Sequence, residues 1–140
     1  MGYDNPTDSQ SALLFAIEEA KLRGARLLVV TTWELPTESW EELPPTDEIM
    51  KRYRTEAEEI LAEAAATVER EAPNLEVEVM ASEGKLGDAL LDHAAQAALM
   101  VVATRGHGAV TGLLLGSVGH EVIGHAHIPV VVVPSPEHLD

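Results

Sequence analysis

The sequence predicts an α/β protein in which an open, mostly parallel sheet is covered by helices on both faces. Helical and strand patterns alternate along the whole chain. Two apolar runs, at 27–32 and 99–103, lack the polar alternation of a half-exposed strand, so each is expected to be buried on both faces. The length of 140 residues, 46% of them hydrophobic, fits a single domain over residues 1–140.

The first predicted helix precedes the first of these two runs. Apolar residues recur at helical spacing over 13–20, with Asp8 or Ser9 available as the N-cap. Gly24 stands where a helix commonly ends in a left-handed residue. The run at 27–32 follows at once, and its β-branched residues favour a central strand of a parallel sheet.

A loop, a long helix and an edge strand come next. Residues 33–45 are acidic and contain three prolines, which is typical of a surface loop. Thr46 is the predicted cap of a helix that carries one apolar stripe and ends before Pro73. Residues 75–81 alternate with period two, so this strand has one face in the core and belongs at the edge of the sheet.

The second half of the chain continues the same alternation. Its predicted elements are a helix at 87–98, a strand at 99–103, a glycine-rich loop at 105–116, a short helix at 117–125 and a strand at 128–133. With right-handed crossovers, this order makes a parallel sheet whose ligand site lies outside the carboxyl ends of the strands.

Charge and composition exclude several classes of function. The formal charge of −15 repels nucleic-acid backbones and anionic membrane surfaces. The absence of cysteine removes thiolate catalysis, disulfides and cysteine zinc sites. No apolar run approaches the roughly 18 residues of a membrane span, and the chain opens without a signal-peptide pattern, so the sequence predicts a soluble cytoplasmic protein.

The glycine-rich loop carries the strongest indication of chemistry. Four glycines between 106 and 116 allow close approach of a ligand, and Gly116 with Ser117 presents backbone N–H groups and a hydroxyl at a helix start. Arg105 is the one Lys or Arg after Lys85. An anion site is one interpretation, and a tight turn with close helix packing is the other, because the spacing matches neither a Walker A loop nor the dinucleotide fingerprint.

Spacing also points to a known family. Gly106, nine residues, and then Gly116-Ser117 match the second half of the signature G-x2-G-x9-G-[ST]. On these residues, and on the segments at 16–27 and 118–133, the chain resembles the universal stress protein family over essentially its whole length. The resemblance implies a five-stranded sheet of order 3-2-1-4-5, counted along the chain, that binds ATP or AMP, with Mg²⁺ accompanying a triphosphate.

The same resemblance assigns residues to a nucleotide site. Asp4 would meet adenine and ribose, and Thr32 would line the adenine pocket. The residues expected to hold the phosphates are Arg105, Gly106, Gly116, Ser117 and Val118. Ala103 occupies the position of the first signature glycine, where its methyl group would lie against the ribose.

The N-terminus departs from the family pattern. The family's first strand is represented here by residues 1–3 alone, ahead of Asp4. Three residues are too few to complete hydrogen-bonding ladders with two flanking buried strands, and unpaired backbone groups would cost about 1 to 3 kcal/mol each. The sequence therefore predicts that the first strand is truncated and that the native chain begins several residues earlier.

Three functional hypotheses remain open. The leading one is a stress-related protein that binds an adenine nucleotide and uses its occupancy to set conformation or partners. The second is a dimeric protein-interaction module that has lost nucleotide binding, which Ala103 and the short start favour. The third and weakest is slow ATP hydrolysis, because no catalytic base is apparent.

The last strand and the histidines near it bear on dimerisation and metal binding. No charged residue lies between Ile128 and Val133, so this last strand is predicted to form a homodimer contact instead of an exposed apolar edge. His120, His125 and His127 are poorly spaced for a shared metal, and His125 is interpreted as a favourable group at a helix C-terminus. We therefore expect no metal site.

Overall fold

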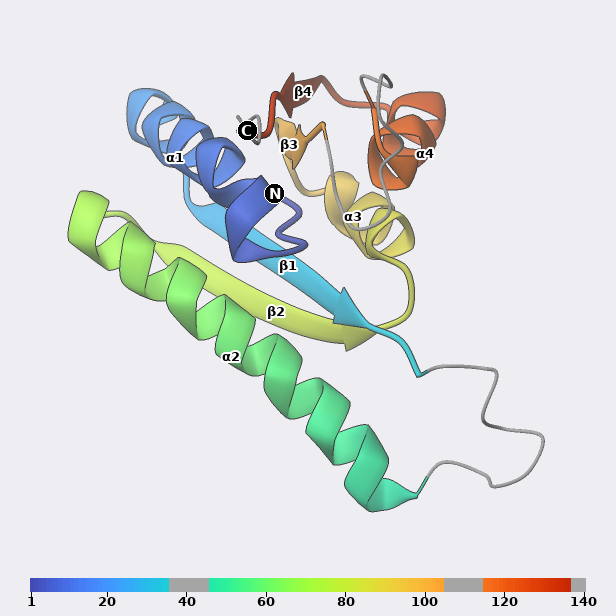
Figure 1. Ribbon diagram of the computed structural model, residues 1–140. Helices are drawn as coiled ribbons and strands as arrows, with labels where there is room; N and C mark the ends of the chain where they lie inside the picture. Colours follow the sequence, from blue (N-terminus) through green and yellow to red (C-terminus); the bar gives the residue numbers. More distant parts are fainter. Residues whose placement is uncertain (36–45, 105–114, 137–140) are drawn as a thin grey trace.

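The computed structural model describes residues 1–35, 46–104 and 115–136 (Figure 1). Four helices and four strands alternate through this part of the chain. In order they are α1 (Pro6–Arg23), β1 (Leu27–Trp33), α2 (Asp47–Glu71), β2 (Val77–Glu83), α3 (Leu86–Ala94), β3 (Met100–Ala103), α4 (Ser117–His125) and β4 (Val130–Val133). No helix within these ranges is both long enough and apolar enough to cross a bilayer.

The ends of α1 show how local hydrogen bonds set helix boundaries. The N-cap is Asn5, whose side chain accepts a hydrogen bond from the Asp8 N–H at 2.8 Å. The prediction of Asp8 or Ser9 as the cap is therefore wrong. Pro6 then takes the first helical position, which needs no N–H donor. Gly24 ends the helix with φ 61°, as predicted.

The remaining boundaries follow the sequence patterns within a few residues. Thr46 caps α2, accepting a hydrogen bond from the Ile49 N–H at 3.2 Å, and α4 has the predicted bounds. The strand expected at 75–81 instead runs over Val77–Glu83, and the helix expected at 87–98 ends at Ala94. In both places the sequence pattern includes residues that lie outside the regular element, 75–76 before β2 and 95–98 after α3.

The strands form two parallel pairs. β1 pairs with β2, and β3 pairs with β4. Residues 1–3 lie between the two pairs as an isolated bridge, Gly2 opposite Val30, because a segment this short cannot form a ladder. The predicted five-stranded order is therefore not confirmed, although the α/β architecture with parallel strands is.

The N-terminal segment (residues 1–3) nevertheless contacts both pairs. The Tyr3 N–H donates to the Val30 carbonyl at 2.8 Å, and the Val30 N–H donates to the Met1 carbonyl at 2.9 Å. On the other side, the Gly2 N–H donates to the Val101 carbonyl at 3.1 Å. The segment thus spans the gap between the middle of β1 and the first half of β3.

Two cores lie on opposite sides of the strands. Helices α1 and α2 cover one side, and α3 and α4 cover the other (Figure 1). Val29 belongs to the first core and its neighbour Val30 to the second, while Val101 and Val102 divide in the same way. All four are at most 4% exposed, which confirms that β1 and β3 are buried on both faces.

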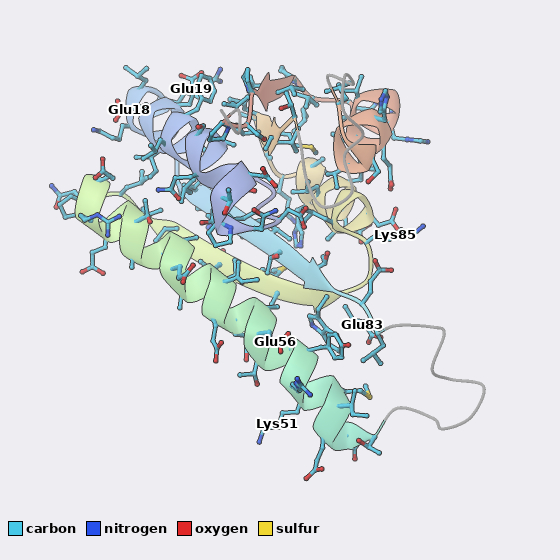
Figure 2. The ribbon with its side chains drawn as sticks, in the orientation of Figure 1. Glu18, Glu19, Lys51, Glu56, Glu83 and Lys85 are labelled. Atoms are coloured by element: carbon cyan, nitrogen blue, oxygen red, sulfur yellow. The ribbon has the colours of Figure 1, made fainter. Side chains whose placement is uncertain are left out.

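Charged side chains lie on the outer faces of the helices. Glu18 of α1 and Lys51 and Glu56 of α2 are exposed, as Figure 2 shows. Glu18 pairs with Lys21 at 3.3 Å, and Glu56 pairs with Arg52 at 3.7 Å. Such exposed pairs contribute little to stability, so these residues are the solvated helix faces that the sequence predicts.

Candidate functional site

The candidate site lies where three segments end or begin together. Asp4 follows the N-terminal segment, Ala103 is the last residue of β3, and Ser117 is the first residue of α4. Because the N-terminal segment and β3 run in the same direction as β1 and β4, their carboxyl ends meet at one side of the molecule. This is the position at which open parallel sheets bind ligands.

A small hollow of about 30 Å³ marks the meeting point. Five residues that the resemblance assigned to the nucleotide lie around it. The full lining is Gly2, Asp4, Ser9, Leu86, Val102, Ala103, Gly116, Ser117, Val118 and Gly119. The hollow is large enough for part of a ligand, such as a phosphate or an edge of a ribose, and the rest of a nucleotide would extend beyond it.

The three remaining predicted residues are Thr32, Arg105 and Gly106. Thr32 lies near the end of β1, opposite Ser82 of β2, and does not border the hollow. Its expected contact with adenine therefore remains a prediction. Arg105 and Gly106 fall outside the residues that the structure describes.

The N-terminus of α4 is the most polar feature of the hollow. Gly116 is the N-cap, with an extended backbone (φ −81°, ψ −178°) and no side-chain cap hydrogen bond. Its own N–H donates to the Thr104 carbonyl at 2.6 Å, which joins the start of α4 to the end of β3. The first-turn N–H groups that follow carry the positive end of the helix dipole, the arrangement that favours anions.

Two serines outside the predicted set hold the site together. Ser9 is 1% exposed, and its hydroxyl accepts a hydrogen bond from the Asp4 N–H at 3.1 Å. Ser135 donates through its hydroxyl to the Asp8 carbonyl at 3.0 Å, and its N–H donates to the Thr104 hydroxyl at 3.0 Å. The sequence predicts Ser9 only as one of two possible helix caps, with Asp8, because both roles require the same residue type near a helix start.

Close packing behind the hollow fixes the N-terminal segment. A Cβ added at Gly2 would lie 2.8 Å from the Leu90 side chain and 3.3 Å from that of Leu86, so α3 approaches the backbone directly. Tyr3 is buried beside it, and burial, together with the Glu63 carboxylate, raises the pKa of the Tyr3 hydroxyl. The hydroxyl is therefore protonated at neutral pH. Asp4 follows directly after this buried and closely packed segment.

A pair of carboxyl groups lies where α3 and α4 meet, one turn from the site. A hydrogen bond to Asp88 raises the pKa of Glu121, with smaller contributions in the same direction from desolvation and from the Asp88 charge. Lys85 and His125 act in the opposite direction. The Glu121 carboxyl also fills the space beside Gly87, where an added Cβ would lie 2.8 Å from it.

This carboxyl pair predicts a pH dependence of stability. A raised folded-state pKa gives stability that is fully present below the usual value of 4.5 and is lost as the pH rises through the folded-state pKa. We expect Asp88→Asn to make the fall in stability with rising pH smaller. The same change should raise Tm at pH 7 by about 1 to 2 °C. Thermal melts between pH 4 and 8 measure it. Asp92→Asn, an exposed change on the same helix, is the control, and an equal rise there would contradict the prediction.

Comparison with known proteins places these features in a family. The universal stress protein family matches residues 1–134. A relative from Thermus aquaticus, described as a universal stress protein in the QAH/OAS sulfhydrylase 3' region, is 36% identical over 137 residues, and the match covers 95% of each chain.

Solved structures give the same result. The universal stress protein from Archaeoglobus fulgidus in complex with dAMP is 28% identical, with a TM-score of 0.66 over 94% of this chain and 93% of that one. A universal stress protein in complex with cAMP is 25% identical, with a TM-score of 0.72 over 97% and 95%. The chain belongs to the universal stress protein family.

Proposed function

We propose that this chain is a cytoplasmic stress-related protein that binds an adenine nucleotide, ATP or AMP, at the hollow between Asp4, Ala103 and Ser117. The observation that carries the proposal is the start of α4, which has no side-chain cap and lies against the end of β3. The dAMP and cAMP complexes of similar proteins support an adenine nucleotide as the ligand.

The chemistry of the lining suggests how the ligand would lie. The N–H groups of the first turn of α4 and the Ser117 hydroxyl are donors suited to a phosphate. The Asp4 carboxylate is an acceptor suited to a ribose hydroxyl or the adenine amino group. Arg105 and Gly106 would complete the phosphate contacts, and Mg²⁺ would accompany ATP. Occupancy would then set the conformation of the chain or its choice of partners.

Calorimetric titration with ATP and with AMP tests the proposal. We expect binding by the unaltered chain, about tenfold weaker binding by Ser117→Ala because a hydroxyl contact to a charged group is lost, and unchanged binding by the control Ser11→Ala on α1. Ala103→Gly is expected to tighten binding by removing a methyl group beside the ribose. No heat with either nucleotide at millimolar concentration would overturn the proposal.

The second candidate is a dimeric interaction module that has lost nucleotide binding. Ala103 favours it, because its methyl group narrows a hollow that is already small. Mass spectrometry of small molecules released from the purified chain separates the two candidates. A co-purifying adenine nucleotide supports the nucleotide-binding protein. No co-purifying nucleotide, together with no heat of binding in calorimetry, supports the interaction module.

Under both candidate functions, we propose that β4 forms a homodimer contact. β4 pairs with β3 along one edge, and its four valines are all partly exposed. Because an uncharged apolar edge favours pairing with another chain, we expect a dimeric mass by light scattering at tens of micromolar. Val131→Lys should give a monomer. Val79→Lys, at an exposed position on the edge strand β2, should leave the chain dimeric. A monomeric unaltered chain, or a dimeric Val131→Lys, would contradict this.

A further inference from the structure

Ser135 is a buried polar residue between two exposed ones. It follows β4 and is 8% exposed, while Pro134 and Pro136 on either side of it are exposed. Buried polar groups in proteins are almost always hydrogen-bonded. The partners of Ser135 include Thr104, after β3, and Asp8, in the first turn of α1, which are 31 and 127 residues away in the sequence. Ser135 therefore joins segments that are distant along the chain, on the side where α1 lies beside β3 and β4 (Figure 1).

The first partner, Thr104, connects Ser135 to the start of α4. The Ser135 N–H donates to the Thr104 hydroxyl at 3.0 Å, and the Thr104 N–H donates to the Val133 carbonyl at 2.9 Å. The Thr104 carbonyl accepts a hydrogen bond from the Gly116 N–H at 2.6 Å. Thr104 is thus held at its N–H, its hydroxyl and its carbonyl. Through it, Ser135 supports the N-cap of α4, on the border of the hollow that is suited to a phosphate.

The second partner, Asp8, connects Ser135 to the opposite border of the hollow, which Asp4 forms. The Ser135 hydroxyl donates to the Asp8 carbonyl at 3.0 Å. Asp8 precedes Ser9, whose hydroxyl accepts a hydrogen bond from the Asp4 N–H at 3.1 Å. The Ser9 N–H in turn donates to the Asn5 carbonyl at 3.0 Å. Asp4 is therefore tied to the same helical turn that Ser135 contacts.

The two neighbouring prolines restrict the backbone at this point. Proline fixes its own φ and confines the residue before it to extended conformations, and Ser135 both follows Pro134 and precedes Pro136. A residue with few alternative conformations loses little entropy when it forms its hydrogen bonds. The Ser135 link, from Asp8 through Ser135 to Thr104, is therefore a short and stiff connection between the two borders of the hollow.

We propose that Ser135 is a positioning residue of the nucleotide site, which does not line the hollow but sets the separation between Asp4 and the start of α4. This inference rests on the proposed function. A nucleotide that places its ribose or adenine at Asp4 and its phosphate at α4 gains from both contacts only when the two borders stand at the matching distance. Adenosine reaches the Asp4 border alone, and inorganic phosphate reaches α4 alone. The Ser135 link therefore favours ligands that carry both groups.

Titrations of Ser135→Ala with AMP, adenosine and inorganic phosphate, followed by NMR up to millimolar ligand, test the proposal. Alanine removes the hydroxyl that donates to Asp8 and keeps the N–H that donates to Thr104. We expect AMP to bind about threefold to tenfold more weakly than to the unaltered chain, and adenosine and phosphate to bind as before. An unchanged AMP affinity, or an equal loss for AMP and for either fragment, would overturn the proposal.

Thr104 provides a second pair of variants and a matched control. Thr104→Val removes the acceptor of the Ser135 N–H and should weaken AMP binding about threefold to tenfold, whereas Thr104→Ser keeps the hydroxyl and should restore it. The control is Thr67→Val on α2, because Thr67 is 7% exposed and its hydroxyl donates to the Glu63 carbonyl at 3.1 Å. This control should bind AMP as the unaltered chain does, even where its Tm falls. Equal AMP affinities in Thr104→Val and Thr67→Val would overturn the proposal.

Hydrogen exchange without any ligand separates this inference from the proposed function. In Ser135→Ala we expect faster exchange at the Asp4 amide on one border and at the Gly116 amide on the other, because each donates a hydrogen bond that the Ser135 link supports. The Ala72 amide, at the end of α2, should exchange at an unchanged rate. Faster exchange at both borders supports the Ser135 link even in a chain that binds no nucleotide, a result in which the proposed function alone fails. Unchanged exchange at either border would overturn the link itself.

Discussion

Replacing Tyr3 by alanine is expected to lower the free energy of unfolding by about 3 to 5 kcal/mol. Tyr3 is 1% exposed and belongs to the first core, between the helices on that side and β1. Removing its ring leaves a cavity, and the main-chain bond from Tyr3 to Val30 at 2.8 Å then loses the packing that holds it in register. Because Asp4 follows directly, nucleotide affinity should fall as well.

Urea denaturation measures the effect, and two variants divide it. Tyr3→Phe keeps the ring and should cost no more than about 1.5 kcal/mol, since only the hydroxyl is lost. Tyr53→Ala removes the same side chain from a half-buried position on α2 and should cost less than half as much as Tyr3→Ala. Similar losses for Tyr3→Ala and Tyr53→Ala would show that the N-terminal segment is not an integral part of the core.

Gly116→Val is expected to weaken nucleotide binding by about tenfold to a hundredfold, if the proposed function is correct. Gly116 borders a hollow of only about 30 Å³, where a branched side chain leaves no room for a phosphate. Its backbone is extended, so valine meets no conformational strain there, and the hydrogen bond to Thr104 can persist. The change therefore acts on the ligand more than on the fold.

Calorimetry with ATP and AMP gives the affinity, and a thermal melt of each variant verifies folding. Gly124→Val, in the same helix, is the matched control, because a Cβ added there meets no atom within 4 Å. We expect it to bind nucleotide as the unaltered chain does, with a small gain in helix stability because valine has a higher helix propensity than glycine. An unchanged affinity in Gly116→Val would place the phosphates somewhere other than the start of α4.

Much of the local structure could be predicted from the sequence. The apolar runs that became β1 and β3 identify strands buried on both faces, because continuous apolar sequence has no face left for water. Helix starts such as Thr46 and Ser117 were found where a change of residue type marks a change of hydrogen bonding. The glycine and serine at 116 and 117 likewise located one border of the candidate site.

The other parts of the site depend on distant segments meeting. Thr32 does not border the hollow, so its contact with adenine stays a prediction, and Ser9, offered with Asp8 as a possible cap of α1, instead supports Asp4. Both depend on the exact position at which one strand or helix passes another. That position follows from packing between residues far apart in the chain, which no local pattern records.

The sequence by itself determined the alternation of helices and strands, the two doubly buried strands and the position of the glycine-rich motif. Only the tertiary structure decided that residues 1–3 reach both β1 and β3, and that Asp4, Ala103 and Ser117 meet around one small hollow. Periodicity reports which side of an element is buried, because burial depends on the residue itself. Strand pairing and empty space depend on how completely neighbouring elements fill the volume between them, and that is a property of the assembled fold.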